Sequence, residues 1–183
     1  MSPFSCALAG LAAGLLGSAA LAQTPGIGRP ATGEEIAGWN IDVAPDGAGL
    51  PAGRGTVRKG EKVYARACAS CHGPAGRAGP GFSAPPLAGG QGSLATAHPD
   101  RTVGSYWPYA TTLFDYVRRA MPYDAPESLT ADQLYGVCAY ILSLDGIVGE
   151  NAELDAKSLP GIRMPNRTGF RPAYDEERKG VWR

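Results

Sequence analysis

The sequence has few side chains of the kinds that bind metals: its 183 residues include four cysteines, two histidines and three methionines. A structural zinc site needs four Cys or His ligands, usually grouped in two pairs. Apart from the stretch Cys68-Ala69-Ser70-Cys71-His72, the chain after residue 22 offers only Cys138 and His98, which stand far apart. The sequence therefore argues against a zinc site.

The chain also lacks an excess of charge of either sign, because 17 basic residues balance 17 acidic ones. Proteins that bind nucleic acid or an anionic membrane surface usually carry a clear excess of Lys and Arg. We therefore expect no nucleic-acid partner and no electrostatic attraction to a membrane.

Long apolar runs are missing except at the start of the chain. Residues 1–22 contain an apolar run over 7–16 and the small-residue site Ala20-Leu21-Ala22, although positive residues before the run are absent. This pattern predicts a secretory signal peptide cleaved after Ala22, hence a periplasmic protein without a membrane span. The alternative is a retained anchor, for which about 17 uncharged residues is short.

Glycine and proline, by contrast, are abundant, with 26 and 16 residues. They cluster outside three helix-like segments, so much of the chain must be loop. A short, loop-rich chain buries too little apolar surface from its own side chains. It therefore needs a bound group that fills its core.

Two cysteines three residues apart, followed at once by a histidine, form the attachment pattern of c-type haem: Cys68, Cys71 and His72. One helical turn places both thiols under the two vinyl groups, while the imidazole reaches the iron. Thiol redox enzymes also use such a cysteine pair, but near a βαβ pattern that we do not find here. The sequence predicts one covalently attached haem c.

Helices are expected before and after this motif. The first follows Thr56 as its N-cap and contains Gly60, whose presence inside a helix suggests close approach by another helix. The last begins with the capping box Thr130-Ala131-Asp132-Gln133 and carries an apolar stripe ending at Leu144. Within that stripe we expect Cys138 to be a buried, inert thiol.

A middle helix is expected from Pro108 to the pair Met121-Pro122. Its predicted apolar face consists of Leu113, Tyr116, Val117 and Ala120. Just before and within it stand Tyr106, Trp107, Tyr109 and Arg118, of which the aromatic residues suit the wall of a porphyrin pocket and Arg118 a haem propionate.

The sixth iron ligand decides the chemistry. A methionine thioether closes the iron and gives an electron carrier, whereas an open site allows ligand binding or peroxide chemistry. After residue 22 the methionines are Met121 and Met164. Met121 is favoured because it leaves a helix and precedes a proline; Met164, His98 and an open site are the alternatives.

Two Gly- and Pro-rich or polar segments, 23–55 and 149–183, flank the helices. Residues 39–43 alternate like a short strand, and Trp39 is expected to pack against the haem domain. The final segment is expected to be a tail lying over the domain. Apolar residues of both segments are candidates for a partner surface, namely Trp39, Ile41, Ile162, Met164 and Phe170.

Taken together, the helix with Gly60 and Tyr64, the haem motif, Met121-Pro122 and the helix with Tyr135 and Tyr140 resemble a class I cytochrome c over about residues 56–148. A narrower similarity spans nearly all of the chain after the signal. It is to the cytochrome subunit of the periplasmic sulfane dehydrogenase of the Sox system and to the cytochrome partners of sulfite dehydrogenases. It rests on residues 38–43, 45–51, 102–110 and 119–123, which read GWNIDV, PDGAGLP, TVGSYWPYA and RAMPY.

The resemblance implies an all-α class I cytochrome c fold with irregular N- and C-terminal extensions. In that family a molybdenum-cofactor subunit performs the catalysis and the haem subunit accepts its electrons. Carried over here, Cys68 and Cys71 bind haem, His72 and Met121 ligate the iron, and no residue is catalytic. A downstream cytochrome or oxidase would receive the electrons.

The expected organisation is a signal peptide (1–22), an N-terminal extension (23–55), a haem domain (56–148) and a C-terminal extension (149–183). The single haem motif departs from the longer, two-haem members, which leaves the donor open between a sulfane and a sulfite dehydrogenase. Other readings are a general periplasmic electron shuttle, a haem enzyme with an open distal site, and a haem sensor.

Overall fold

The computed structural model describes residues 27–171. The expected signal peptide lies outside this range. By its internal contacts the chain divides into two units, residues 1–40 and residues 41–183, of which 27–40 and 41–171 are described.

The first unit contains, among its described residues, the helix α2 (Gly33–Trp39). A capping box starts it, because the Thr32 side chain accepts a hydrogen bond from Glu35 N and the Glu35 carboxylate accepts one from Thr32 N. Arg29 pairs with the same carboxylate. No residue of α2 is buried, and Trp39 is 87% exposed. The expected strand over 39–43 is therefore wrong, because the cap sets up a helix that ends at Trp39. The expected packing of Trp39 against the haem domain stays a prediction.

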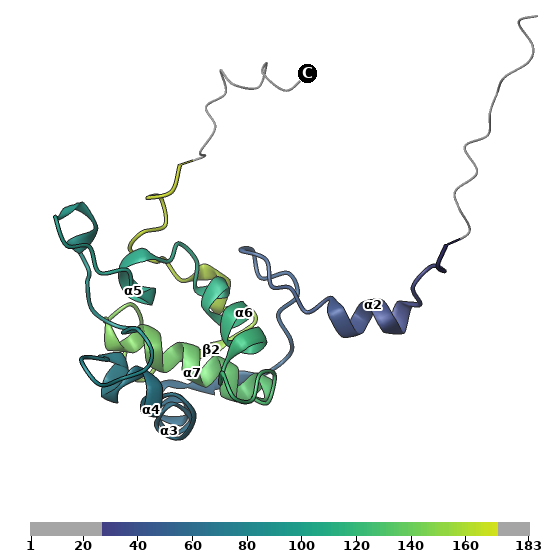
Figure 1. Ribbon diagram of the computed structural model, residues 1–183, viewed down its shortest axis with the longest axis horizontal. Coiled ribbons are helices and arrows are strands. Elements are labelled where there is room, and N and C mark those ends of the chain that lie inside the picture. The colour runs from purple at the N-terminus through teal and green to yellow at the C-terminus, as the bar shows by residue number, and fades with distance from the viewer. Residues whose placement is uncertain (1–26, 172–183) are drawn as a thin grey trace, which may run out of the picture. The chain divides into compact units, whose positions relative to one another are not determined.

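The second unit is mostly helical (Figure 1). Its α-helices are α3 (Val57–Ala67), α4 (Ala69–His72), α5 (Val103–Tyr106), α6 (Ala110–Ala120) and α7 (Ala131–Leu144). Two short strands, β1 (Arg54–Thr56) and β2 (Glu153–Asp155), and 3-10 turns at Pro74–Gly76, Ser93–Ala95 and Leu159–Gly161 complete it. Helix α7 is central, since it packs against α3, α6 and both strands.

Helix α3 crosses α7 where two glycine backbones meet. A Cβ atom on Gly60 would lie 1.8 Å from the carbonyl oxygen of Gly136, and one on Gly55 would lie 2.1 Å from Gly136 N. No larger residue fits at either position without moving a backbone. The predicted close approach at Gly60 is confirmed, and the helix that approaches is α7.

The predicted caps of α3 and α7 are also confirmed. Thr56 accepts a hydrogen bond from Lys59 N at the start of α3, and Thr130 and Gln133 form the full capping box of α7. The tyrosine hydroxyl of Tyr135 in α7 donates to Pro51 O at 2.8 Å, which ties the chain before β1 to this helix.

Helix α6 begins at Ala110 with Tyr109 as N-cap, two residues after the expected start at Pro108. Leu113 and Val117 are buried as predicted. Tyr116, however, is exposed, and its place in the core belongs to Phe114, whose ring lies 4.7 Å from that of Tyr135. The predicted apolar face was therefore rotated away from the true one.

The segment after α7 is more than a tail lying over the domain. Strand β2 pairs antiparallel with β1, with Leu154 opposite Gly55, and Leu154, Leu159 and Met164 are buried in the core. Met164 is 1% exposed. It is therefore removed from the candidates for a partner surface.

Cys138 lies in α7 with no exposed surface. The predicted burial is confirmed, and it raises the pKa of the thiol far above the usual value, which disfavours the reactive thiolate. Among residues 27–171, no helix is long and apolar enough to cross a membrane.

The crossing of α3 and α7 predicts a large effect of Gly60→Ala. The new methyl group would meet the Gly136 carbonyl, so the free energy of unfolding of the haem-loaded protein should fall by about 1–3 kcal/mol. Chemical denaturation measures this. Gly38→Ala is the control, because a Cβ there meets nothing within 4 Å; an equal loss in both variants would contradict the argument.

Candidate functional site

The two cysteines and the histidine of the motif lie on one helical turn. Cys68 ends α3 and caps α4, and Cys71 and His72 complete α4. His72 N donates to Cys68 O at 2.9 Å, so the turn is hydrogen-bonded along its length. The structure thus brings together the three side chains that the sequence selected.

The two thiols differ in their surroundings. Cys68 is half-buried, and burial, with a smaller contribution from Cys71, raises its pKa to about 11. Cys71 is exposed. Neither is in a disulfide, and both are free to form thioether bonds.

The ring of His72 is held by the backbone of a distant loop. Its Nδ1 lies 2.8 Å from Pro85 O, 13 residues away. Because a carbonyl only accepts, Nδ1 must carry the proton, and Nε2 is then the unprotonated nitrogen that can bind a metal. Sequence reasoning missed Pro85, since nothing local in the chain points from it to His72.

Further backbone hydrogen bonds fasten the chain after His72. The Tyr64 hydroxyl, from α3, donates to Gly73 O at 2.8 Å. Ala84 N donates to Cys71 O at 3.2 Å, and Leu87 N to Gly76 O at 2.8 Å. The loop after the motif is therefore folded back onto it.

The two methionines lie in different environments. Met121 is the residue at which α6 ends, and it is partly buried against the core. Met164 is enclosed by protein on all sides. Of these two, Met121 is the one with partly exposed surface, and His98, the other alternative, is exposed in a loop.

The expected pocket residues Tyr106 and Tyr109 contact the C-terminal segment. The rings of Phe170 and Tyr106 meet edge to face with centroids 5.1 Å apart, and Asn166 donates to Tyr106 O at 2.7 Å. The Arg167 guanidinium lies 4.2 Å from the centroid of the Tyr109 ring. Sequence reasoning missed these contacts.

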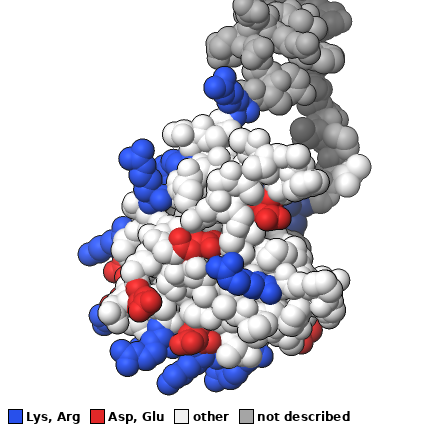
Figure 2. All heavy atoms as spheres, turned by 90° about the vertical axis from the view of Figure 1, so that its left-hand side faces the viewer, with Lys and Arg blue, Asp and Glu red and all other residues white. Residues whose placement is uncertain are grey.

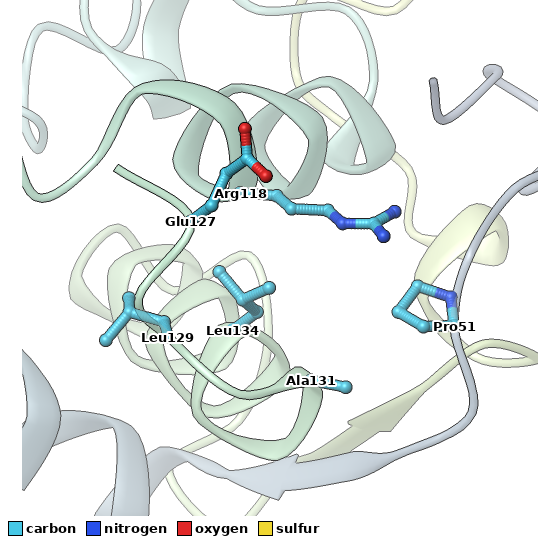
Figure 3. A pocket seen from close by; sticks show the side chains of 6 residues that line it. All are labelled: Pro51, Arg118, Glu127, Leu129, Ala131 and Leu134. Carbon is cyan, nitrogen blue, oxygen red and sulfur yellow. The ribbon is translucent and has the colours of Figure 1, made fainter. Parts of the chain in front are cut away.

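Trp107 and Arg118 make separate contacts of their own. The rings of Trp107 and Tyr116 meet edge to face at 5.7 Å. Arg118 Nη1 donates to Ile41 O at 3.2 Å. Its side chain extends toward Pro51 along a pocket (Figure 3) that is also lined by Glu127, Leu129, Ala131 and Leu134. A role of these residues toward haem stays a prediction.

Within residues 27–171 there is no group of three or more His, Cys, Asp or Glu side chains that could hold a metal ion. The candidate donors are therefore two thiols, one oriented imidazole and the thioether of Met121. These are the donor types that bind haem c.

Two comparisons with known proteins agree on the kind of protein that this chain resembles. The pattern that defines the cytochrome c family matches residues 57–145. The chain belongs to the cytochrome c family. A search of curated proteins finds no match. Among solved structures, a chain of the sulfane dehydrogenase SoxCD from Paracoccus pantotrophus is 39% identical, with a TM-score of 0.77, over 87% of this chain and 76% of that one.

As a member of this family, the protein has a class I cytochrome c fold, one covalently bound haem c and a role in electron transfer. A haem bound by these residues would supply one-electron transfer, because its iron can be ferric or ferrous. The residues present fit the haem, because α4 offers both thiols and Pro85 leaves Nε2 of His72 free.

The hydrogen bond from Tyr64 gives a testable prediction. Tyr64→Phe removes the donor to Gly73 O and should lower the free energy of unfolding by about 1 kcal/mol. Tyr140→Phe is the control, because its ring packs on Tyr64 at 5.1 Å while its hydroxyl has no hydrogen-bond partner in the part of the chain described. Equal losses would contradict a specific contribution of the Tyr64 hydrogen bond.

The pH dependence of the same variant follows from the pKa of Tyr64, which burial raises from 10 to about 12. Between these values the unfolded chain loses the Tyr64 proton and the folded protein keeps it, so stability falls as the pH rises. Tyr64→Phe should show a shallower fall over this range in denaturation series. An unchanged slope would contradict the assignment.

Proposed function

We propose that this cytochrome is a periplasmic, mono-haem electron-transfer subunit of a molybdenum-containing sulfur-compound dehydrogenase. It accepts electrons from the oxidation of a sulfane or sulfite substrate on the molybdenum subunit. It passes them one at a time to a downstream cytochrome or oxidase of the respiratory chain.

One observation carries this proposal. The similarity to the SoxCD chain covers 87% of this chain, far more than the 57–145 stretch that defines the haem domain. Residues outside the haem domain are therefore shared as well. A free electron shuttle would need only the haem domain, whereas a subunit of a complex also needs a surface for its partner.

We propose the following sites within the organisation expected from the sequence (1–22 signal peptide, 23–55 extension, 56–148 haem domain, 149–183 extension). Cys68 and Cys71 form the thioether bonds, and His72 and Met121 are the axial ligands. The pocket residues are Tyr106, Trp107, Tyr109 and Arg118. Support for Met121 comes from its accessible side chain and from the burial of Met164.

The charges of this protein give little long-range attraction toward a partner. The net charge is zero, and Figure 2 shows acidic side chains among basic ones on the face it presents, with basic side chains gathered along its lower edge. On α3 the exposed basic residues are Arg58, Lys59, Lys62 and Arg66. Weak steering suits a subunit that stays bound better than a carrier that must find its partner at every turnover.

Helix α2 is the part of the described chain best suited to hold that partner. It is only seven residues long, and so short a helix is marginal in water without tertiary contacts. Ile36 and Trp39 stand three residues apart, on one face, and both are exposed. The molybdenum subunit is the occupant we propose for this face, with Trp39 as its aromatic anchor.

The ligand assignment predicts different results for the two methionines. Met121→Ala should leave the haem attached, abolish the Met-to-iron charge-transfer band of the ferric protein and lower the reduction potential. Met164→Ala should keep the band but lose about 2–5 kcal/mol of stability, as for other buried methionines. Absorption spectra and denaturation separate the two. Loss of the band in Met164→Ala alone would reverse the assignment, and carbon monoxide binding by the wild-type ferrous protein would indicate an open site.

The partner assignment is tested by haem reduction in a mixture of this cytochrome and the molybdenum subunit. Addition of a sulfane or sulfite substrate should reduce the haem, and the substrate that does so identifies the donor.

Trp39→Ala should weaken the complex by about 2 kcal/mol or more, roughly thirtyfold in Kd, with an unchanged spectrum. Glu34→Ala, on the same helix, is the control. No reduction by either substrate rejects the donor, and equal Kd values for the two variants reject α2 as the anchor.

A further inference from the structure

The carboxylate of Asp145 joins three parts of the structure at the end of α7. Its Oδ1 accepts a hydrogen bond of 2.7 Å from Gly89 N, 56 residues away. Its Oδ2 lies against α5, so close that a Cβ atom on Gly104 would be 2.1 Å from it. The Asp145 carbonyl also accepts from the side chain of Gln91 at 3.2 Å. Glycine at 104 thus makes room for this carboxylate.

Gly89 belongs to the loop whose Pro85 carbonyl holds His72. The same loop is fixed at other points: Leu87 N and Ala88 N donate to Gly76 O at 2.8 and 3.1 Å, and Gly89 O accepts from Thr102 Oγ1 at 2.7 Å. Asp145 supplies the charged member of this set. Hydrogen bonds to an ionised acceptor are stronger than neutral ones. We therefore expect the bond from Gly89 N to Asp145 to be the strongest of those that hold this end of the loop.

We propose that Asp145 is a positioning residue for the proximal haem ligand. By holding Gly89 N it fixes the loop that aims Pro85 O at Nδ1 of His72. The Nδ1 hydrogen bond makes the imidazole a more basic ligand, which favours the ferric state. Asp145 thereby keeps the reduction potential of the iron low. This inference rests on His72 as the axial ligand, but not on any particular electron donor.

Four variants of the haem-loaded protein test it. Asp145→Ala removes both the charge and the hydrogen bond. Asp145→Asn removes the charge but keeps an oxygen that can accept from Gly89 N. Gly104→Ala keeps the charge and displaces the carboxylate. Asp132→Ala is the matched control, since Asp132 also lies on α7 and accepts from a backbone group, Arg54 N, at 2.8 Å.

The readouts are hydrogen exchange of Gly89 N–H and of the His72 Nδ1 proton by NMR, together with the reduction potential. In Asp145→Ala and Gly104→Ala both protons should exchange roughly ten- to hundredfold faster, because the loss of one charge-assisted hydrogen bond changes an equilibrium by about that factor. The reduction potential of the haem iron should rise. Asp145→Asn keeps a weaker, uncharged hydrogen bond and should fall between Asp145→Ala and the wild type in both readouts. Asp132→Ala should stay close to the wild type.

Equal potentials in Asp145→Asn and Asp145→Ala would show that the charge alone acts, which overturns the proposal. Unchanged exchange at His72 in both Asp145→Ala and Gly104→Ala would do the same. The NMR spectrum of the wild-type protein shows separately whether His72 is a ligand at all. Failure of the ligand assignment is thus distinguishable from failure of the role of Asp145.

Discussion

The contact between the backbones of Gly60 and Gly136 is the constraint on which the arrangement of this cytochrome depends. It lets α3 and α7 cross without side chains between them, and α3 runs directly into the turn that carries both haem-binding cysteines. The position of that turn relative to the core is therefore set by the helix crossing. Gly55, which also touches Gly136, extends the same contact to β1 and through it to β2.

Orientation of His72 is a second, independent constraint, because a helical turn places the imidazole but leaves its ring free to rotate. The carbonyl of Pro85 removes this freedom. A carbonyl can do so only if its own loop is held, and the hydrogen bonds to Gly76, Thr102 and Asp145 hold it. The haem site is thus built from a local motif whose geometry is completed by distant segments.

This division explains how much could be predicted from the sequence. The haem motif, the caps of α3 and α7 and the tight packing at Gly60 are encoded within a few residues and were predicted. The pairing of β1 with β2 joins segments about a hundred residues apart, and Pro85 has no signal of its own. The error at Tyr116 had another cause: Phe114 and Tyr116 are both apolar enough to face the core, and only the direction of α7 decides between them.

The two flanking segments of the haem domain differ in what their residues do. Leu154, Leu159 and Met164 are core residues, so these side chains serve folding and are not available to a partner. Within α2 no side chain is buried. A seven-residue helix of this kind is marginal in water by itself. If the proposed partner binds α2, folding and assembly rest on separate segments, and a change in one need not disturb the other.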